Sequence, residues 1–164
     1  MTNESISGTI GLTRGAHVGI SVSDLDRSIA FYSALTGREP VASGTMDTVP
    51  FGHSQGLSNA QLRYATINLD NIGIDLIHFE DPKGAPTEGA ANRPGSMHLC
   101  LYVDDFDAVY ERMKAAGIEF LGDDYTFAAG EVTPEDALGT QVAYFNDPDG
   151  TNLEIIAPRG GFAN

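Results

Sequence analysis

Positive charge is scarce in this sequence. Its 164 residues include 9 Lys and Arg against 23 Asp and Glu, which gives a formal net charge of −14. An acidic surface repels the phosphates of nucleic acids and the headgroups of anionic membranes. The sequence also has no apolar run of about 18 residues, the length that a membrane-spanning helix needs. We therefore expect a protein that binds neither nucleic acid nor a membrane.

Cysteine is scarcer still. Cys100 stands alone, so no disulfide can form within the chain. Residues 1–11 are polar and lack the basic and then apolar order of a secretory signal peptide. A chain of this length buries about two thirds of its unfolded surface and needs no disulfide to hold it together. These features predict a cytoplasmic location.

Two common catalytic motifs are missing as well. The sequence contains no glycine-rich loop of the phosphate-binding type and no Gly-x-Ser-x-Gly turn that would expose a nucleophilic serine. Any chemistry must come from other side chains.

The chain contains an internal repeat. A strand pattern followed by a helix pattern occupies residues 16–37 and returns over 97–117, with His17 matching His98 at an offset of 81. At the end of each half, residues 74–77 match residues 153–156. A half of this size cannot easily close a sheet of its own, so two halves are expected to share one. The repeat predicts an α+β fold in which two tandem βαβββ modules form a curved mixed sheet around a central cleft.

The repeat also divides the chain into segments. Residues 81–95 contain three prolines and three glycines, a composition typical of a linker. We predict a flexible arm over 1–14, modules over 15–80 and 96–158, and a tail over 159–164. Within the modules, residues 118–121 are expected to form a strand, and residues 50–59 and 122–139 are expected to be loops. The second loop is either a lid over the site or a solvated acidic loop.

The duplication singles out four residues with metal-binding chemistry. His17 and His98 open the first strand of each half, and Asp75 and Glu154 occupy equivalent places in the last strand. If a pseudo-twofold axis relates the halves, the four side chains meet near that axis. Two imidazoles and two carboxylates suit a divalent first-row metal, and the assembled site would be neutral. The alternative is that the histidines are ordinary polar residues and that a carboxylate faces solvent.

Other residues are candidates for substrate contacts. Arg63 and Tyr64 are neighbours in one strand, so one of them should face the cleft; Arg63 would then bind an anionic substrate, or else be a surface arginine. His53 either reaches the substrate from its loop or is a surface histidine. His78 alternates away from Asp75 and should face the helix layer or solvent. Cys100 shares the face of His98 or is a small core residue.

These motifs together resemble the vicinal oxygen chelate superfamily, which includes glyoxalase, bleomycin-resistance protein and extradiol dioxygenase. The resemblance covers about residues 15–158. The matching stretches are Ala16-His17-Val18, Asp24-Leu25-Asp26, Phe31-Tyr32, Ser96-Met97-His98-Leu99, Val103-Asp104-Asp105, Asp147-Pro148-Asp149-Gly150 and Leu153-Glu154.

The resemblance implies a homodimer and a cup around a divalent metal ion, which would be Ni, Co, Zn, Fe or Mn. It also implies a small-molecule substrate that binds through two neighbouring oxygens. The ligands carried over by position are His17, Asp75, His98 and Glu154.

Two departures narrow the choice within the superfamily. Asp75 is shorter than the Glu, Gln or His that usually fills its position, which puts its direct ligation in doubt. The catalytic histidine of extradiol dioxygenases is absent from residues 135–140, ahead of Tyr144. Both metal-site histidines are present, which weighs against a bleomycin-type binder.

We therefore predict a metal-dependent isomerase, epimerase or lyase of the glyoxalase or methylmalonyl-CoA epimerase type. Glu154 is expected to be the firm ligand, and Asp75 or Glu154 to move the proton. Arg63, Tyr144 and His53 are the predicted substrate contacts. The alternatives are a drug- or metabolite-binding resistance protein without turnover and an atypical dioxygenase.

Overall fold

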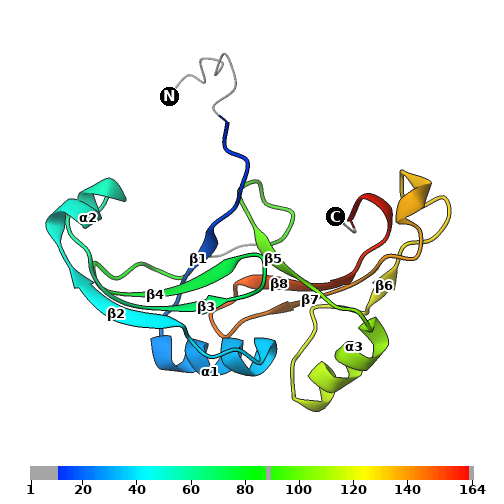
Figure 1. The fold of residues 1–164 in the computed structure, drawn as a ribbon, viewed down its shortest axis with the longest axis horizontal. Coiled ribbons are helices and arrows are strands. Elements are labelled where there is room, and N and C mark those ends of the chain that lie inside the picture. The colour runs from blue at the N-terminus through cyan, green and yellow to red at the C-terminus, as the bar shows by residue number, and fades with distance from the viewer. Residues whose placement is uncertain (1–10, 88–89, 163–164) are drawn as a thin grey trace.

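The computed structural model describes residues 11–87 and 90–162 and shows two sheets side by side (Figure 1). Residues 1–10 of the predicted arm, 88–89 of the linker and 163–164 of the tail lie outside the described residues. The first half contains β1 (His17–Ser21), α1 (Leu25–Thr36), β2 (Ala42–Asp47), α2 (Val49–Ser54), β3 (Gln61–Asn68) and β4 (Gly73–Asp81). The second contains β5 (His98–Tyr102), α3 (Phe106–Ala115), β6 (Tyr125–Thr126), β7 (Gln141–Asn146) and β8 (Asn152–Ala157), with 3₁₀ turns at Glu135–Ala137 and Gly160–Phe162.

The two sheets have the same topology. Their strand orders are β1-β4-β3-β2 and β5-β8-β7-β6. In each sheet the first strand runs parallel to the fourth, and the other neighbours are antiparallel. This repeated mixed topology confirms the predicted α+β fold of two tandem βαβββ modules. Each module forms a four-stranded sheet of its own, whereas the repeat predicts one sheet shared by both. The predicted segment boundaries themselves remain a prediction.

Equivalent caps start the two main helices. The carboxylate of Asp24 accepts a hydrogen bond from the Arg27 amide, and the carboxylate of Asp105 accepts one from the Ala108 amide. Such bonds satisfy amides that the first helical turn leaves unpaired. Gly37 ends α1 with φ of 67°, a left-handed conformation that glycine adopts without strain. The helices therefore begin at matching points of the repeat.

The core lies between the strands and the two helices, which are on the same side of the sheets (Figure 1). Strand side chains alternate, so every second residue faces this core. One continuous cluster combines both modules, and it includes Ile20, Tyr32, Ile67, Ile74, Leu76, Phe106, Met113, Phe145, Leu153 and Ile155. The other faces of the two sheets carry Asp75 in β4 and Glu154 in β8.

Three local predictions were wrong. Residues 49–54 form α2 where a loop was expected; Pro50 lies in its first turn, where proline is compatible with a helix. The predicted strand at 118–121 is reduced to a single bridge between Phe120 and Phe145. The predicted loop 122–139 contains β6 and a 3₁₀ turn. None of the helices that the structure describes is long and apolar enough to cross a membrane.

Candidate metal centre

The strand register gives both modules the same arrangement of polar residues. In module 1, Gly19 of β1 and Thr66 of β3 lie on either side of Asp75 in β4. In module 2, Cys100 of β5 and Tyr144 of β7 lie on either side of Glu154 in β8. Each histidine is two residues before the residue paired with the carboxylate, so it shares that face of its strand. The equivalence predicted from the repeat therefore extends to single residue pairs.

Module 1 forms an open half-site. His17 Nε2 lies 3.6 Å from Asp75 Oδ2, and Thr66 Oγ1 donates a hydrogen bond of 2.7 Å to Asp75 Oδ1. The side chains of His17 and Asp75 are 55% and 24% exposed. One carboxylate oxygen is thus held by a hydroxyl, while the other faces the imidazole and the solvent.

Module 2 forms a more enclosed half-site. His98 Nε2 lies 2.9 Å from Glu154 Oε2, and Glu154 is only 5% exposed. The ring of Tyr144 packs edge-on against the His98 ring, with centroids 5.7 Å apart. Burial, together with hydrogen bonding to Glu154 and its charge, raises the pKa of the Cys100 thiol to about 12. The same causes raise the pKa of the Tyr144 hydroxyl. Both groups therefore stay protonated and can donate to the Glu154 carboxylate.

The chemistry of these side chains fits a divalent metal ion. A buried carboxylate is costly unless it is paired, and the only ion-pair partner of Glu154 in the described part of the chain is the imidazole of His98. Imidazole nitrogens and carboxylate oxygens are ligands for first-row divalent metals. Within residues 11–87 and 90–162, however, no three His, Cys, Asp or Glu side chains are positioned to hold one ion. The structure brings the four predicted ligands together as two pairs, and the joint centre remains a prediction.

The candidate substrate contacts are distributed over different faces. Arg63 Nη2 lies 3.0 Å from Asp26 Oδ1 of α1, so this side chain points to the helix side of the sheet. Tyr64 alternates with Arg63 and shares the face of Thr66. His53 lies in α2 and is exposed. Of the three residues predicted to contact substrate, Tyr144 alone is within a half-site, and all three roles stay predictions.

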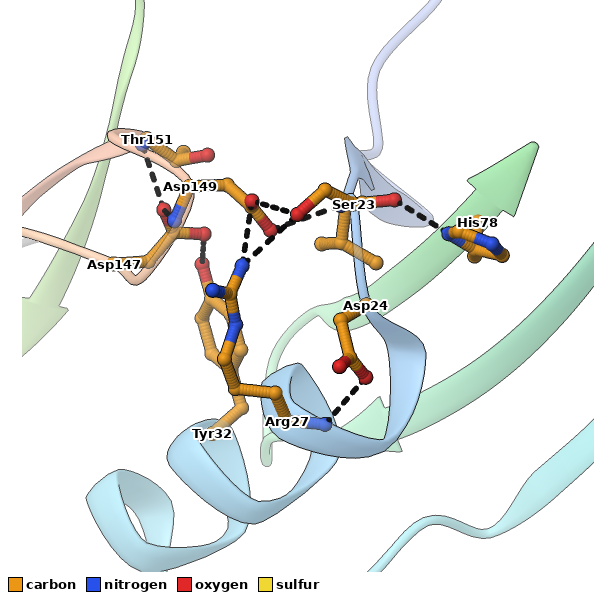
Figure 2. Close-up of polar contacts among 9 residues, drawn as sticks. Ser23, Asp24, Arg27, Tyr32, His78, Asp147, Asp149 and Thr151 are labelled. Carbon is orange, nitrogen blue, oxygen red and sulfur yellow. Dashed lines mark hydrogen bonds and ion pairs between the residues drawn. The ribbon is translucent and has the colours of Figure 1, made fainter. Parts of the chain in front are cut away.

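His78 is placed as its alternation predicted. Its Nδ1 lies 3.0 Å from the Val22 carbonyl oxygen (Figure 2). Positions 75 and 78 of β4 alternate to opposite faces of the sheet. Sequence reasoning missed Thr66, since a threonine in a strand is commonplace. The signal that identifies it is the register, because it occupies the position in module 1 that Tyr144 occupies in module 2.

A polar network joins the two modules. Tyr32 Oη of α1 donates a hydrogen bond of 3.0 Å to Asp147 Oδ2, in the turn between β7 and β8. Arg27 Nη2 lies 2.7 Å from Asp149 Oδ1, and the amide and hydroxyl of Ser23 also donate to Asp149 (Figure 2). The Asp-Pro-Asp-Gly motif thus contacts the other half of the chain.

Comparisons with known proteins agree with this architecture. A family model described as Glyoxalase/Bleomycin resistance protein/Dioxygenase superfamily matches residues 14–155. The chain is 27% identical to a 2-epi-5-epi-valiolone epimerase from Actinomyces sp over 95% of this chain and 84% of the relative. It is 28% identical to the mitochondrial methylmalonyl-CoA epimerase of Homo sapiens, over 77% and 67%, and 28% identical to the lactoylglutathione lyase of Haemophilus influenzae, over 85% and 89%.

Solved structures give the same result for the fold. A glyoxalase family protein from Bacillus cereus superposes with a TM-score of 0.71 at 20% identity, covering 95% of this chain and 99% of the other. The fosfomycin resistance protein FosX of Listeria monocytogenes, solved with Mn(II) and sulfate, superposes with a TM-score of 0.53 at 18% identity, covering 93% of each chain. At these identities the likeness concerns the fold alone.

Proposed function

The chain belongs to the Glyoxalase/Bleomycin resistance protein/Dioxygenase superfamily, and from this premise we propose that it is a divalent-metal-dependent epimerase, isomerase or lyase. The substrate class is a small molecule with two neighbouring oxygens, in which a proton moves next to a carbonyl. The observation that carries the proposal is the buried Glu154 carboxylate, whose ion-pair partner is an imidazole. The epimerases and the lyase among the relatives support the type of reaction.

His17, His98 and Glu154 would hold the metal ion, with Asp75 as a weaker or water-bridged ligand. When bound, such an ion acts as a Lewis acid that lowers the pKa of the carbon acid beside a coordinated carbonyl. The Glu154 carboxylate suits the role of firm ligand because His98, Tyr144 and Cys100 surround it and limit its motion. A ligand held in this way keeps its geometry while substrates exchange.

Asp75 suits the role of proton carrier. The Thr66 hydroxyl holds one of its oxygens at 2.7 Å, and this bond orients the carboxylate. The other oxygen lies 3.6 Å from His17 and remains accessible, since the side chain is 24% exposed. A positioned carboxylate of this kind can take a proton from one face of a substrate carbon and return it.

The experiment that tests the proposal measures metal content and proton exchange together. Purified protein is loaded with Ni, Co, Zn, Fe or Mn and incubated in deuterated water with methylmalonyl-CoA, 2-epi-5-epi-valiolone or the hemithioacetal of glutathione and methylglyoxal. Metal-dependent deuterium incorporation next to the carbonyl of one of them is the expected result. A protein that takes up no metal would refute the proposal.

The same experiment separates the alternatives. Tight binding of a compound without exchange indicates a binding protein without turnover. Consumption of oxygen with a catechol indicates a dioxygenase.

A further inference from the structure

The duplication creates two comparable contacts between the modules. Each involves the turn that connects the last two strands of one module and the main helix of the other. The turn between β7 and β8 contacts α1 through hydrogen bonds. The turn between β3 and β4 and the helix α3 both line one groove, together with parts of α1 and β5. The two contacts can therefore be compared residue by residue.

The first contact is closed and buried. Tyr32 is fully buried and Asp147 is 5% exposed, and their hydrogen bond crosses from one module to the other (Figure 2). Asp147 also accepts hydrogen bonds from the amides of Asp149 and Thr151, which fix the shape of the turn. Although burial opposes it, the bonds from Ser23 and Arg27 hold the pKa of Asp149 below its usual value. Both aspartates of the motif therefore accept hydrogen bonds from residues of module 1.

The second contact lacks these groups. At the offset of 81, Tyr32 corresponds to Met113 and Arg27 to Ala108, neither of which can form the equivalent bond. Asp70 corresponds to Asp149 at the offset of 79 that relates Asp75 to Glu154. It pairs instead with Arg38 within its own module, at 2.7 Å. A groove of about 920 Å³ is lined by this turn, α1, β5 and α3, mainly by apolar side chains.

The closed contact lies near both half-sites along the chain. Ser23 follows β1, six residues after His17, and Asp149 precedes Glu154 by five residues in the turn that leads into β8. Metal–ligand distances tolerate shifts of only about 0.2 Å. A rotation of one module against the other would therefore separate His17 and Asp75 from His98 and Glu154.

We propose that Asp147 and Asp149 are positioning residues that fasten α1 to module 2 and so set the distance between the two half-sites. The hydrogen bonds to Tyr32, Arg27 and Ser23 form this fastening, which we call the latch. The effect of the latch on metal binding rests on the proposed function, whereas its effect on the arrangement of the modules is independent of that function. The second contact has an open groove and lacks the groups that form these hydrogen bonds. Among the described residues, the latch is therefore the polar restraint between a turn of one module and the helix of the other.

The test breaks the Tyr32 and Arg27 contacts of the latch and measures the arrangement of the modules without metal. The latch variant combines Tyr32→Phe, which keeps the ring in the core, with Arg27→Gln. The control is Arg38→Gln, which breaks an ion pair of the same 2.7 Å length within module 1. Nitroxide labels at the exposed positions Ala42→Cys and Ala115→Cys, in a Cys100→Ser background, report the distance between modules by pulsed electron resonance.

The parent and the control should give one narrow distance distribution, and the latch variant a broadened or shifted one. In chains that keep Cys100, calorimetric titration with Mn²⁺ or Co²⁺ should show affinity reduced about 10–100-fold in the latch variant and unchanged in the control. An unchanged distance distribution in the latch variant would overturn the proposal. So would a broadened distribution with undiminished metal affinity.

A parent protein that binds no metal, but whose latch variant broadens the distribution, would support the latch and refute the proposed function. If the double variant does not fold, Tyr32→Phe alone serves, because it removes a single hydroxyl.

Discussion

Neutralising Glu154 and neutralising Asp75 should have different effects, the first on metal affinity and the second on turnover. Glu154 is 5% exposed and lies 2.9 Å from His98, so Glu154→Gln removes a charge from an enclosed ligand. We expect metal affinity to fall by more than the 10–100-fold that the loss of an outer partner of a metal ligand costs. Asp75→Asn removes a charge that is 24% exposed and 3.6 Å from His17. It should keep most of the affinity but lower turnover by about 10²–10⁴, the usual contribution of a general base.

Calorimetric metal titration and deuterium exchange at the substrate carbon, measured on the same preparations, provide the assay. Thr66→Val is the matched control, because it removes the hydroxyl that orients Asp75 and leaves the carboxylate. It should lower exchange less than Asp75→Asn does. Full exchange activity in Asp75→Asn would refute the assignment of Asp75 as base. If Asp75→Asn loses metal as completely as Glu154→Gln does, Asp75 is an ordinary metal ligand.

Three further predictions concern stability and assembly. The pKa of Asp149 is lowered in the folded state, so its contribution to the free energy of unfolding is present above its ordinary pKa of 3.8 and lost as the pH falls below 3.8 through the lowered folded-state pKa; urea titrations should show less acid dependence in Asp149→Asn. Gly52→Ala should destabilise the protein by about 1–3 kcal/mol in urea unfolding, because a Cβ there would overlap the backbone of Asn59. An unchanged midpoint would contradict that packing. Sedimentation should give twice the 17.4 kDa of one chain if the predicted homodimer forms, and a single-chain mass at micromolar concentration would count against it.

The fold was predictable from the sequence because the repeat imposes the same local signals twice. Asp24 and Asp105 cap equivalent helices, and the alternation that places His78 away from Asp75 follows from the geometry of a strand. The helix α2 was not predictable in the same way. It has six residues, among them Pro50 and Gly52, and such residues are as typical of a turn as of a short helix.

Only those parts of the candidate site that the internal repeat duplicates were predictable from the sequence. The repeat pairs His17 with His98 and Asp75 with Glu154, and the structure places each histidine beside the carboxylate of its own module. The bond between Tyr32 and Asp147 joins residues 115 positions apart. No local pattern encodes a contact of that kind, so the role of the Asp-Pro-Asp-Gly motif became visible only in three dimensions.

The two modules have the same topology but differ in the size of the side chains around their carboxylates, and the larger residue is always in module 2. At the three positions around each carboxylate, module 1 has Gly19, Asp75 and Thr66, and module 2 has the larger Cys100, Glu154 and Tyr144. The larger set encloses its carboxylate at 5% exposure, whereas the Asp75 side chain stays 24% exposed. A ligand needs a fixed geometry, and a proton carrier needs access to the substrate. Under the proposed function, module 2 therefore supplies the more firmly held ligands, and module 1 supplies the accessible proton carrier. This division requires the two modules to keep a constant distance, which is the property that the latch supplies on one side of the molecule.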